Sequence, residues 1–508
     1  MPEGKIIFIT SVPEKPGRSG SLATVPDDGT LWGEVSGDLF KAIQTVEYAG
    51  LPLGKKIYKA GTDGPDTTDS HPPASRKFFL EQAPKFFDLV ELNFGRDTMP
   101  DVLHSVPPAA RLISIMLEPT TADKLEACFY QMASIQAAYY KIVIRAEKSG
   151  DELLPLSLLK KLGRTDVIAY ASGPLGAWTR MVAPTLGSPA IYATLADDPL
   201  PDGAFPVHTL LNDYGLTRPT RFEHLYGIAG NPVFRSLSPR LHNAAYRRLD
   251  FPGFFVPFHI EDYEMFHREV VQSPLLPSIG FAIEGLTVVS PFKEAGFRMA
   301  DEVIHPVSGI TQSCNLLAKR DNRWIADSTD PLAILQALKR LEVAPRNLRA
   351  GVIGCGGAGR AIAATLARAG AKVVLFNRTP GRGQLASCQL NIPFDLLENL
   401  VPETFDILVN ATPLGKQAHE RPFDPDRLSG ASVFIDYAYG KHNTLVIESL
   451  RDRGIGCVDG REVLIIQVRR QFEVMTGEIM SEELAMRQAF ELEPEQQLTD
   501  HTKTAHEE

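Results

Sequence analysis

The sequence predicts an α/β protein in which an N-terminal (β/α)8 barrel of the TIM type is followed by a second half that ends in a Rossmann domain. Two patterns predict this class. Short apolar runs alternate with segments of helical spacing through the first half. In the second half, a glycine-rich turn from Gly354 to Gly359 separates an apolar run from a helix-period segment. At 508 residues the chain exceeds what one core usually organises, so two or three domains are expected.

Composition and charge narrow the function classes. Apolar residues make up 44% and charged residues 22% of the chain, as in soluble globular proteins. The net charge of −10 disfavours nonspecific nucleic-acid binding, which depends on neutralising phosphates. The five cysteines show no paired spacing, so neither a disulfide framework nor a metal site is expected. No secretory signal or membrane-length apolar run is visible, so we expect a cytoplasmic protein with small-molecule partners.

Eight strand-like runs alternate with helical segments over residues 1–218, as in a closed (β/α)8 barrel. Active sites on that fold gather at the C-terminal ends of the strands, which points to Glu34, Glu91, Lys141 and Ser172. The predicted strands are Lys5–Thr10, Leu31–Val35, Lys56–Ala60, Leu89–Phe94, Arg111–Leu117, Tyr139–Ile144, Asp166–Ala171 and Pro189–Leu195.

Lys141 stands between two tyrosines and an Ile-Val-Ile run, so its ammonium is expected among apolar groups. Desolvation lowers the pKa of a lysine and frees the amine to attack a ketone as a Schiff base. The alternative is a strand lysine paired with a barrel carboxylate. Local features do not decide between the two.

The segments Ala138–Ile144, Tyr170–Arg180 and Ala183–Pro189 resemble the type I 3-dehydroquinate dehydratases. The resemblance implies that Lys141 forms the imine, that Arg180 binds the substrate carboxylate and that Glu34 is what remains of a Glu-x-Arg substrate-binding pattern. Several family residues are missing. Met116 stands where the family carries its acid/base histidine, and the changes elsewhere are Ser36, Lys59 and the segment Leu200–Pro206, which lacks a glutamine.

Loss of a general acid/base forfeits about 10²–10⁴ in rate. We therefore predict a barrel that keeps the fold and the imine lysine but is weak or inactive as a dehydratase.

The glycine-rich turn predicts a nucleotide site. Its residues permit a tight turn and close approach of a pyrophosphate to the N-terminus of a helix expected over Arg360–Ala369. The alternative is a purely structural turn. The residues concerned are Gly354, Gly356, Gly357, Ala358 and Gly359.

The end of the next predicted strand, Ala371–Phe376, indicates which nucleotide binds. An NAD site usually places an acid there, whereas this chain reads Asn377-Arg378-Thr379, with Arg382 following. Guanidinium groups bind a 2′-phosphate that a carboxylate would repel, so NADP is predicted. A solvated loop arginine is the alternative.

A polar, proline-broken segment, Leu216–Arg221, places a domain boundary near 219–222. Beyond the next apolar run, Pro239 after Ser238 predicts a helix start with Ser238 as the N-cap. Alternatively, Ser236 and Ser238 present hydroxyl groups to a ligand carboxylate.

From about Leu225 to Phe490 the chain resembles shikimate dehydrogenase, a two-lobed module. The resemblance implies a substrate-binding domain at 222–332, completed by 464–490, and an NADP-binding Rossmann domain at 333–463. The polar residues 491–508 are expected to form a disordered tail. The motifs that carry the resemblance are Gly230–Asn243, Gly285–Glu294, Ser313–Asn315, Asp327–Asp330, Asn410–Gly415, Asp436–Tyr439, Asp459-Gly460 and Gln467.

The same resemblance assigns roles. Lys293 is the acid/base and Asp330 its partner at the substrate hydroxyl, with a surface ion pair as the alternative. Ser236 and Ser238 bind the carboxylate. The remaining assignments are Val289, Asn315, Tyr439 and Gln467 to the substrate, and Thr412 and Gly460 to the cofactor.

Val289 and Ser328 replace the family's threonine and asparagine, which leaves open whether shikimate or quinate is preferred. The favoured interpretation is an NADP-dependent shikimate dehydrogenase behind a dehydratase-like barrel. A fully bifunctional enzyme, a quinate/shikimate dehydrogenase and a non-catalytic sensor remain alternatives.

Overall fold

The computed structural model describes residues 5–12, 28–48, 53–61, 73–415, 420–440 and 443–491. The chain divides into two compact units. The first comprises residues 1–225, 232–235 and 252–282, and the second comprises residues 226–231, 236–251 and 283–508. The predicted tail lies outside the described residues, apart from Glu491.

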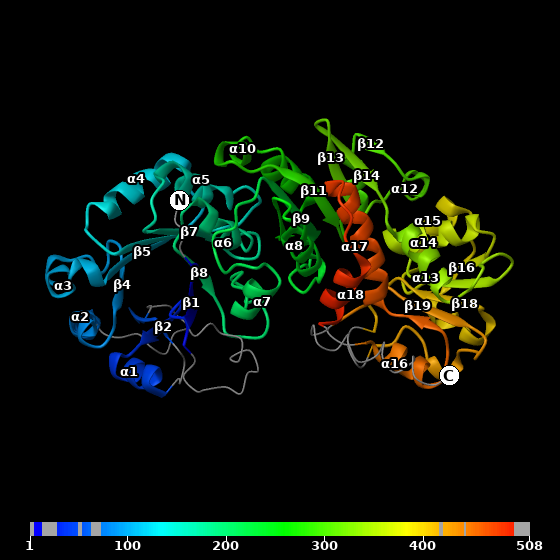
Figure 1. Ribbon diagram of the computed structural model, residues 1–508, viewed down its shortest axis with the longest axis horizontal. Coiled ribbons are helices and arrows are strands. Elements are labelled where there is room, and N and C mark those ends of the chain that lie inside the picture. The colour runs from blue at the N-terminus through cyan, green and yellow to red at the C-terminus, as the bar shows by residue number, and fades with distance from the viewer. Residues whose placement is uncertain are drawn as a thin grey trace, which may run out of the picture. The chain divides into compact units, whose positions relative to one another are not determined.

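The first unit contains an eight-stranded sheet in the order β7-β6-β5-β4-β3-β2-β1-β8 (Figure 1). Every adjacent pair in this order is parallel, as expected of a (β/α)8 barrel. The predicted strand positions are correct to within two residues. The strands are β1 Ile7–Ser11, β2 Leu31–Gly37, β3 Lys55–Ala60, β4 Leu89–Asn93, β5 Arg111–Leu117, β6 Tyr139–Arg145, β7 Val167–Ser172 and β8 Ala190–Ala193.

The interior of this barrel is filled by at least one apolar side chain from every strand. Because side chains alternate between the two faces of a strand, residues two positions beyond this layer face the same side, toward the carboxyl end. The shared core residues are Ile9, Trp32, Ile57, Leu89, Leu112, Val143, Ile168, Tyr170 and Ala190. The helices along this part of the chain are α1 Leu39–Tyr48, α2 Pro73–Gln82, α3 Pro100–Ser105, α4 Ala122–Ala133, α5 Leu153–Leu162, α6 Thr179–Val182 and α7 Val207–Asn212.

A second, mixed sheet follows in the order β10-β9-β11-β13-β14-β12. Its strands are β9 His224–Gly230, β10 Gly253–His259, β11 Ile283–Val288, β12 Glu302–Val303, β13 Leu316–Arg320 and β14 Arg323–Asp327. The helices between them are α8 Ser238–Leu249, α9 Tyr263–Phe266, α10 Leu275–Ile279, α11 Lys293–Arg298 and α12 Pro306–Thr311.

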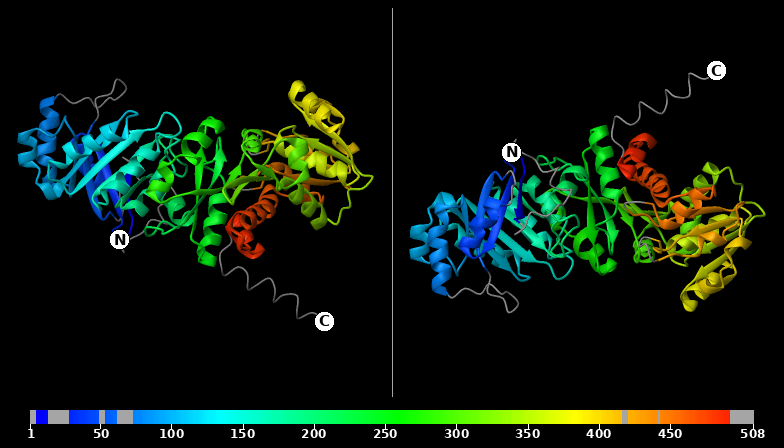
Figure 2. Two further views of the ribbon diagram at one scale, coloured as in Figure 1. Left: turned by 90° about the horizontal axis from the view of Figure 1, so that it is seen from above. Right: turned by 90° about the horizontal axis from the view of Figure 1, so that it is seen from below.

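The third sheet is parallel and has the order β17-β16-β15-β18-β19-β20, which is a Rossmann arrangement. Helices cover both of its faces (Figure 2). The strands are β15 Arg349–Ile353, β16 Lys372–Asn377, β17 Phe394–Leu396, β18 Ile407–Asn410, β19 Val433–Asp436 and β20 Cys457–Val458. The helices are α13 Asp330–Arg340, α14 Gly357–Arg368, α15 Pro380–Leu390, α16 Leu445–Asp452, α17 Gly460–Thr476 and α18 Glu482–Phe490.

Alternate residues of the central strands enter different cores. Val352 packs with α13 and α14, whereas its neighbour Ile353 packs with α16 on the other face. This burial on both faces explains why the strands read as continuous apolar runs.

Local sequence sets the helix ends around the site. Helix α17 begins at a capping box in which Asp459 accepts backbone bonds and Glu462 reaches back to the cap, and it ends at Gly477 in a left-handed conformation. Helix α14 begins three residues earlier than predicted, at Gly357, because the glycines of the turn themselves enter the helix. Within the described residues, no helix has the length and apolar character needed to cross a bilayer.

Candidate active sites

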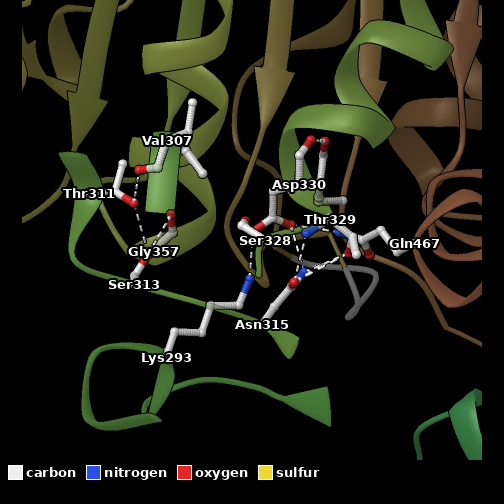
Figure 3. Close-up of polar contacts among 12 residues, drawn as sticks. Lys293, Val307, Thr311, Ser313, Asn315, Ser328, Thr329, Asp330, Gly357 and Gln467 are labelled. Carbon is white, nitrogen blue, oxygen red and sulfur yellow. Dashed lines mark hydrogen bonds and ion pairs between the residues drawn. The ribbon is translucent and has the colours of Figure 1, made fainter. Parts of the chain in front are cut away.

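The candidate site in the second unit is built around a lysine–carboxylate pair. Lys293 opens α11 and Asp330 opens α13, and the Lys293 Nζ lies 2.8 Å from Asp330 Oδ2 (Figure 3). The Asp330 side chain is 2% exposed and that of Lys293 is 17% exposed. The pair is therefore largely withdrawn from water, which excludes the alternative of an ordinary surface ion pair.

The second carboxylate oxygen of Asp330 binds amides. Gln467 Nε2 donates to Oδ1 over 2.6 Å and Asn315 Nδ2 donates over 3.4 Å. The hydroxyl of Tyr437 donates to the main-chain oxygen of the same residue over 3.3 Å. Asp330 thus gathers three of the residues predicted from the sequence, Lys293, Asn315 and Gln467, around one buried carboxylate.

Thr329 fixes the amide of Asn315. The amide oxygen accepts from the Thr329 backbone N–H over 2.9 Å, and Nδ2 donates to Thr329 Oγ1 over 2.9 Å. The sequence analysis assigned no role to Thr329 or Tyr437. Both flank predicted site residues, and that adjacency was the only signal for them in the sequence.

Ser236 and Ser238 lie at the start of α8. The prediction that Ser238 caps this helix is wrong, because the helix begins at Ser238 itself and Leu237 occupies the N-cap position. Ser236 Oγ accepts the backbone N–H of Ser238 over 3.2 Å. The hydroxyl of Tyr439 hydrogen-bonds the Ser236 side chain, and burial raises the pKa of this tyrosine. Ser236, Ser238 and Tyr439 therefore form one polar group.

The glycine turn has the geometry of a phosphate site. Gly354 adopts φ +108°, and a Cβ on Gly359 would lie 1.8 Å from the carbonyl oxygen of Gly354. A Cβ on Gly356 would meet nothing within 4 Å. No side chain caps α14, so its first N–H groups are available to an anion in this open space, and Ala358 lies in that first turn.

The turn also touches Lys293 of the lysine–carboxylate pair. A Cβ on Gly357 would lie 3.1 Å from Lys293 Cδ and 3.1 Å from Ser313 Oγ. The backbone of Lys293 is held in turn by the Cys314 N–H, which donates to its carbonyl oxygen over 3.0 Å. The lysine stem therefore packs directly on the nucleotide turn.

The predicted 2′-phosphate residues follow β16. Asn377 Oδ1 accepts from the backbone N–H of Cys355 in the turn over 3.3 Å, and its Nδ2 donates to the Thr379 carbonyl oxygen over 2.9 Å. Arg378, Thr379 and Arg382 are exposed at the start of α15. Both guanidinium groups are thus presented to solvent beside the turn.

Three further residues that the sequence predicts for the site are Thr412, Gly460 and Val289. Thr412 Oγ1 donates to Asn410 Oδ1 over 2.7 Å, and its methyl group would contact a Cβ on Gly354. A Cβ on Gly460 would lie 2.2 Å from the carbonyl oxygen of Ala438, so close backbone packing accounts for that glycine. Val289 directly follows β11 and donates its N–H to the Ala229 carbonyl oxygen over 3.0 Å.

In the barrel, the expectation that the Lys141 ammonium lies among apolar groups is wrong, because it pairs with carboxylates of the barrel, and its role in forming an imine stays a prediction. Its Nζ lies 2.7 Å from Glu91 and 3.8 Å from Glu34. The carboxylates come from β4 and β2, which are separated from β6 by one and three strands in the sheet order. Nζ also donates to the hydroxyl of Tyr192 over 3.1 Å, a residue that the sequence analysis did not single out.

The two glutamates differ in acidity. Burial, together with the charge of Glu91, raises the pKa of Glu34. Burial also works against ionisation of Glu91, but the charges of Lys141 and Lys59 lower the pKa of that carboxyl overall. The Glu91 carboxylate, in turn, raises the pKa of Lys59, whose Nζ lies 3.6 Å away. Glu91 is therefore the fixed anion of this group.

The other barrel residues predicted from the sequence make separate contacts. The guanidinium of Arg180 stacks on Tyr170 at 4.5 Å and donates to the Asp202 main-chain oxygen over 2.7 Å. Its buried Nε has no hydrogen-bond partner among the described residues. Met116 lies near the end of β5 and is 65% exposed, and Ser172 ends β7 opposite Arg145. The position of the family's histidine thus offers only a thioether.

A buried lysine–carboxylate pair packed on a Rossmann phosphate turn defines a nicotinamide-dependent oxidoreductase, joined here to a lysine-bearing barrel. Comparison with known proteins agrees. Residues 228–316 match the shikimate dehydrogenase substrate binding domain, and residues 77–219 match type I 3-dehydroquinase. Residues 320–435 match the NAD binding domain of the D-isomer specific 2-hydroxyacid dehydrogenases.

Two relatives compared by sequence give the same result. The shikimate dehydrogenase (NADP(+)) of Thermococcus kodakarensis is 34% identical over 258 residues, which are 50% of this chain and 91% of that protein. The shikimate biosynthesis protein AroDE of Chlamydia pneumoniae is 26% identical over 403 residues, 79% of this chain and 80% of that protein. A solved shikimate 5-dehydrogenase from Thermus thermophilus, in complex with NADP(H) and shikimate, is 25% identical with a TM-score of 0.46, covering 52% of this chain and 98% of that one. The chain belongs to the shikimate dehydrogenase family.

Proposed function

We propose that this chain is a shikimate-pathway enzyme whose second half reversibly reduces 3-dehydroshikimate to shikimate with NADPH. The observation that carries the proposal is the Lys293–Asp330 pair, 2.8 Å apart and packed on the nucleotide turn. The barrel is a 3-dehydroquinate dehydratase-like module whose dehydratase activity is weak or absent.

The acid/base step follows from this pair. NADPH, when bound, supplies the hydride to the ketone carbon. As negative charge develops on the ketone oxygen, the Lys293 ammonium donates a proton to it, and the product is the secondary alcohol. The Asp330 side chain holds the Lys293 amine in place, while the amides of Gln467 and Asn315 donate to its other oxygen.

The remaining polar groups supply recognition. We assign the substrate carboxylate to Ser236, Ser238 and Tyr439, since the Ser236 hydroxyl accepts the Ser238 backbone N–H and hydrogen-bonds the Tyr439 hydroxyl. A site built from such donors and acceptors rejects analogues that leave them unpaired. Val289 offers no hydroxyl to the substrate.

The cofactor site suits NADP. The open space at Gly356 and the uncapped end of α14 fit a pyrophosphate. The exposed Arg378 and Arg382, with Thr379, would hold a 2′-phosphate by charge-assisted hydrogen bonds. Thr412 and Gly460 border the same edge of the sheet.

The barrel retains groups for a carboxylate-bearing ketone. Lys141 is the nucleophile, and the Nε of Arg180, which has no hydrogen-bond partner in the part of the chain that the structure describes, is a donor for the substrate carboxylate. Met116, however, cannot transfer a proton, and the missing histidine accounts for a loss of about 10²–10⁴ in rate.

We also propose the domain division 1–218, 222–332 with 464–490, and 333–463, and a cytoplasmic location. All five cysteines are free, as is usual in a reducing compartment.

Two single variants of the full chain test the assignment. Lys293→Ala should abolish NADPH-dependent reduction of 3-dehydroshikimate without changing the slow conversion of 3-dehydroquinate, and Lys141→Ala should do the reverse. If Lys293→Ala retained wild-type reduction, the redox assignment would fail. If Lys141→Ala retained dehydration, the barrel would not be the source of that activity.

A further inference from the structure

The barrel contains a hydroxyl group that joins its lysine to one of its two glutamates. Lys141 Nζ donates to the Tyr192 hydroxyl over 3.1 Å, and that hydroxyl donates to Glu34 Oε2 over 3.1 Å. The ammonium also lies 4.4 Å from the centre of the Tyr192 ring, which holds it over the aromatic face. The three residues come from β6, β8 and β2, so only the curvature of the sheet into a barrel brings them together.

We propose that Tyr192 and Glu34 form the proton relay for imine formation at Lys141, in place of the histidine that Met116 replaces. The proposal rests on the proposed binding of 3-dehydroquinate, a ketone that carries a carboxylate. Both residues touch or face the reacting nitrogen, and the hydrogen bonds already run in the direction of proton removal from it.

The chemistry balances without an external acid or base. The ammonium first gives one proton through Tyr192 to the Glu34 carboxylate. The free amine then forms a bond to the ketone carbon, and the ketone oxygen takes that proton back from Glu34. A second proton then leaves the nitrogen by the same route and reaches the hydroxyl group, the carbon–oxygen bond breaks, and water departs. Ammonium and ketone have become iminium and water, and Glu34 is a carboxylate again.

The two glutamates divide the work. Burial and the Glu91 charge raise the pKa of Glu34, which makes its carboxylate the stronger base. Glu91 contacts Lys141 at 2.7 Å, but its lowered pKa makes it a poor proton acceptor. Glu91 therefore holds the lysine in place, whereas Glu34 exchanges protons.

The test is the rate of imine trapping in the full-length chain. The protein is incubated with 3-dehydroquinate and borohydride, and the reduced adduct at Lys141 is measured over time by peptide mass spectrometry. Tyr192→Phe and Glu34→Gln should each slow labelling about 10²-fold, and the double variant should be no slower than either single one because they share one path. Tyr139→Phe, which removes a hydroxyl group from the first residue of β6, is the matched control and should label at the wild-type rate.

The outcomes separate the two proposals. If the wild-type chain labels and both variants label equally fast, the relay is refuted while the imine function stands. If the wild-type chain does not label, the imine chemistry proposed for the barrel fails, and the relay fails with it. Far-ultraviolet circular dichroism of each variant shows whether the fold is kept, and Glu34→Asp, which retains a carboxylate, should recover part of the labelling rate only if proton transfer is the cause.

Discussion

Replacing Asp330 by asparagine tests the proposed catalytic role of the Lys293–Asp330 pair with almost no change in side-chain volume. The carboxylate accepts from Lys293 over 2.8 Å at one oxygen and from Gln467 over 2.6 Å at the other. An amide has only one oxygen, so one of these donors must face an NH2 group. The lost charge-assisted hydrogen bond corresponds to about 1.5–3 kcal/mol.

At about 1.36 kcal/mol for each tenfold change, this range predicts turnover about 10- to 150-fold lower in Asp330→Asn. The free energy of unfolding should fall by a similar number of kcal/mol, since the Asp330 side chain is only 2% exposed. Steady-state oxidation of shikimate, followed by NADPH absorbance, measures the first quantity, and urea unfolding measures the second.

Asp327→Asn is the matched control. Asp327 is buried at the end of β14, three residues earlier, and accepts the backbone N–H of Ser328 over 2.7 Å. Burial raises the pKa of this carboxyl, so a neutral amide should replace it with little loss of turnover. Equal turnover in wild type and Asp330→Asn would refute the role of the pair. Equal losses in the two variants would show that any buried substitution here disturbs the fold.

Three further predictions concern the cofactor turn and pH. Gly359→Ala should cost at least about 2 kcal/mol of stability and abolish cofactor binding, since its Cβ would lie 1.8 Å from a backbone oxygen. Gly356→Ala has open space around its Cβ, so its stability should stay within about 0.5 kcal/mol of wild type. Thermal melts with and without NADP distinguish the two variants. Arg378→Ala should raise the KM for NADP about tenfold or more and leave the KM for NAD unchanged, and equal effects on both cofactors would contradict a 2′-phosphate contact. Burial lowers the pKa of His242 to about 3 from an ordinary value of about 6.5. Between these two values the unfolded chain binds a proton at His242 that the folded chain does not bind, so the free energy of unfolding falls as the pH falls from about 6.5 toward about 3. Between pH 7 and pH 5 the wild-type protein should lose about 2 kcal/mol more than His242→Leu in urea titrations, and parallel pH profiles would contradict this.

The periodic parts of the fold were predictable from the sequence. The eight barrel strands were predicted to within two residues because each is a short apolar run that can be recognised in the sequence without knowing its partners. The Rossmann turn was predicted from its glycines, which are required by backbone contacts as close as 1.8 Å. The start of α8 was mispredicted because Ser-Pro normally marks a cap, whereas here Leu237 takes that position.

The sites were less accessible to sequence reasoning. Lys293 and Asp330 were paired only through family resemblance, because nothing local joins residues 37 positions apart. The environment of Lys141 was mispredicted because its neighbours in the chain are apolar while its neighbours in space, Glu91 and Glu34, come from other strands. Tyr192 was missed for the same reason, since only closure of the barrel brings it to the lysine.

The fate of the hydride tests directly whether this chain reduces 3-dehydroshikimate with NADPH and whether Lys293 is needed for the reduction. The full-length chain is given 3-dehydroshikimate and NADPH carrying deuterium at the transferable position of the nicotinamide ring, and the product is examined by mass spectrometry and NMR. We expect shikimate with one deuterium on the carbon that bears the new hydroxyl group, and at least about 10²-fold less of it from Lys293→Ala. Shikimate without deuterium, or labelled shikimate formed equally fast by Lys293→Ala, would contradict it.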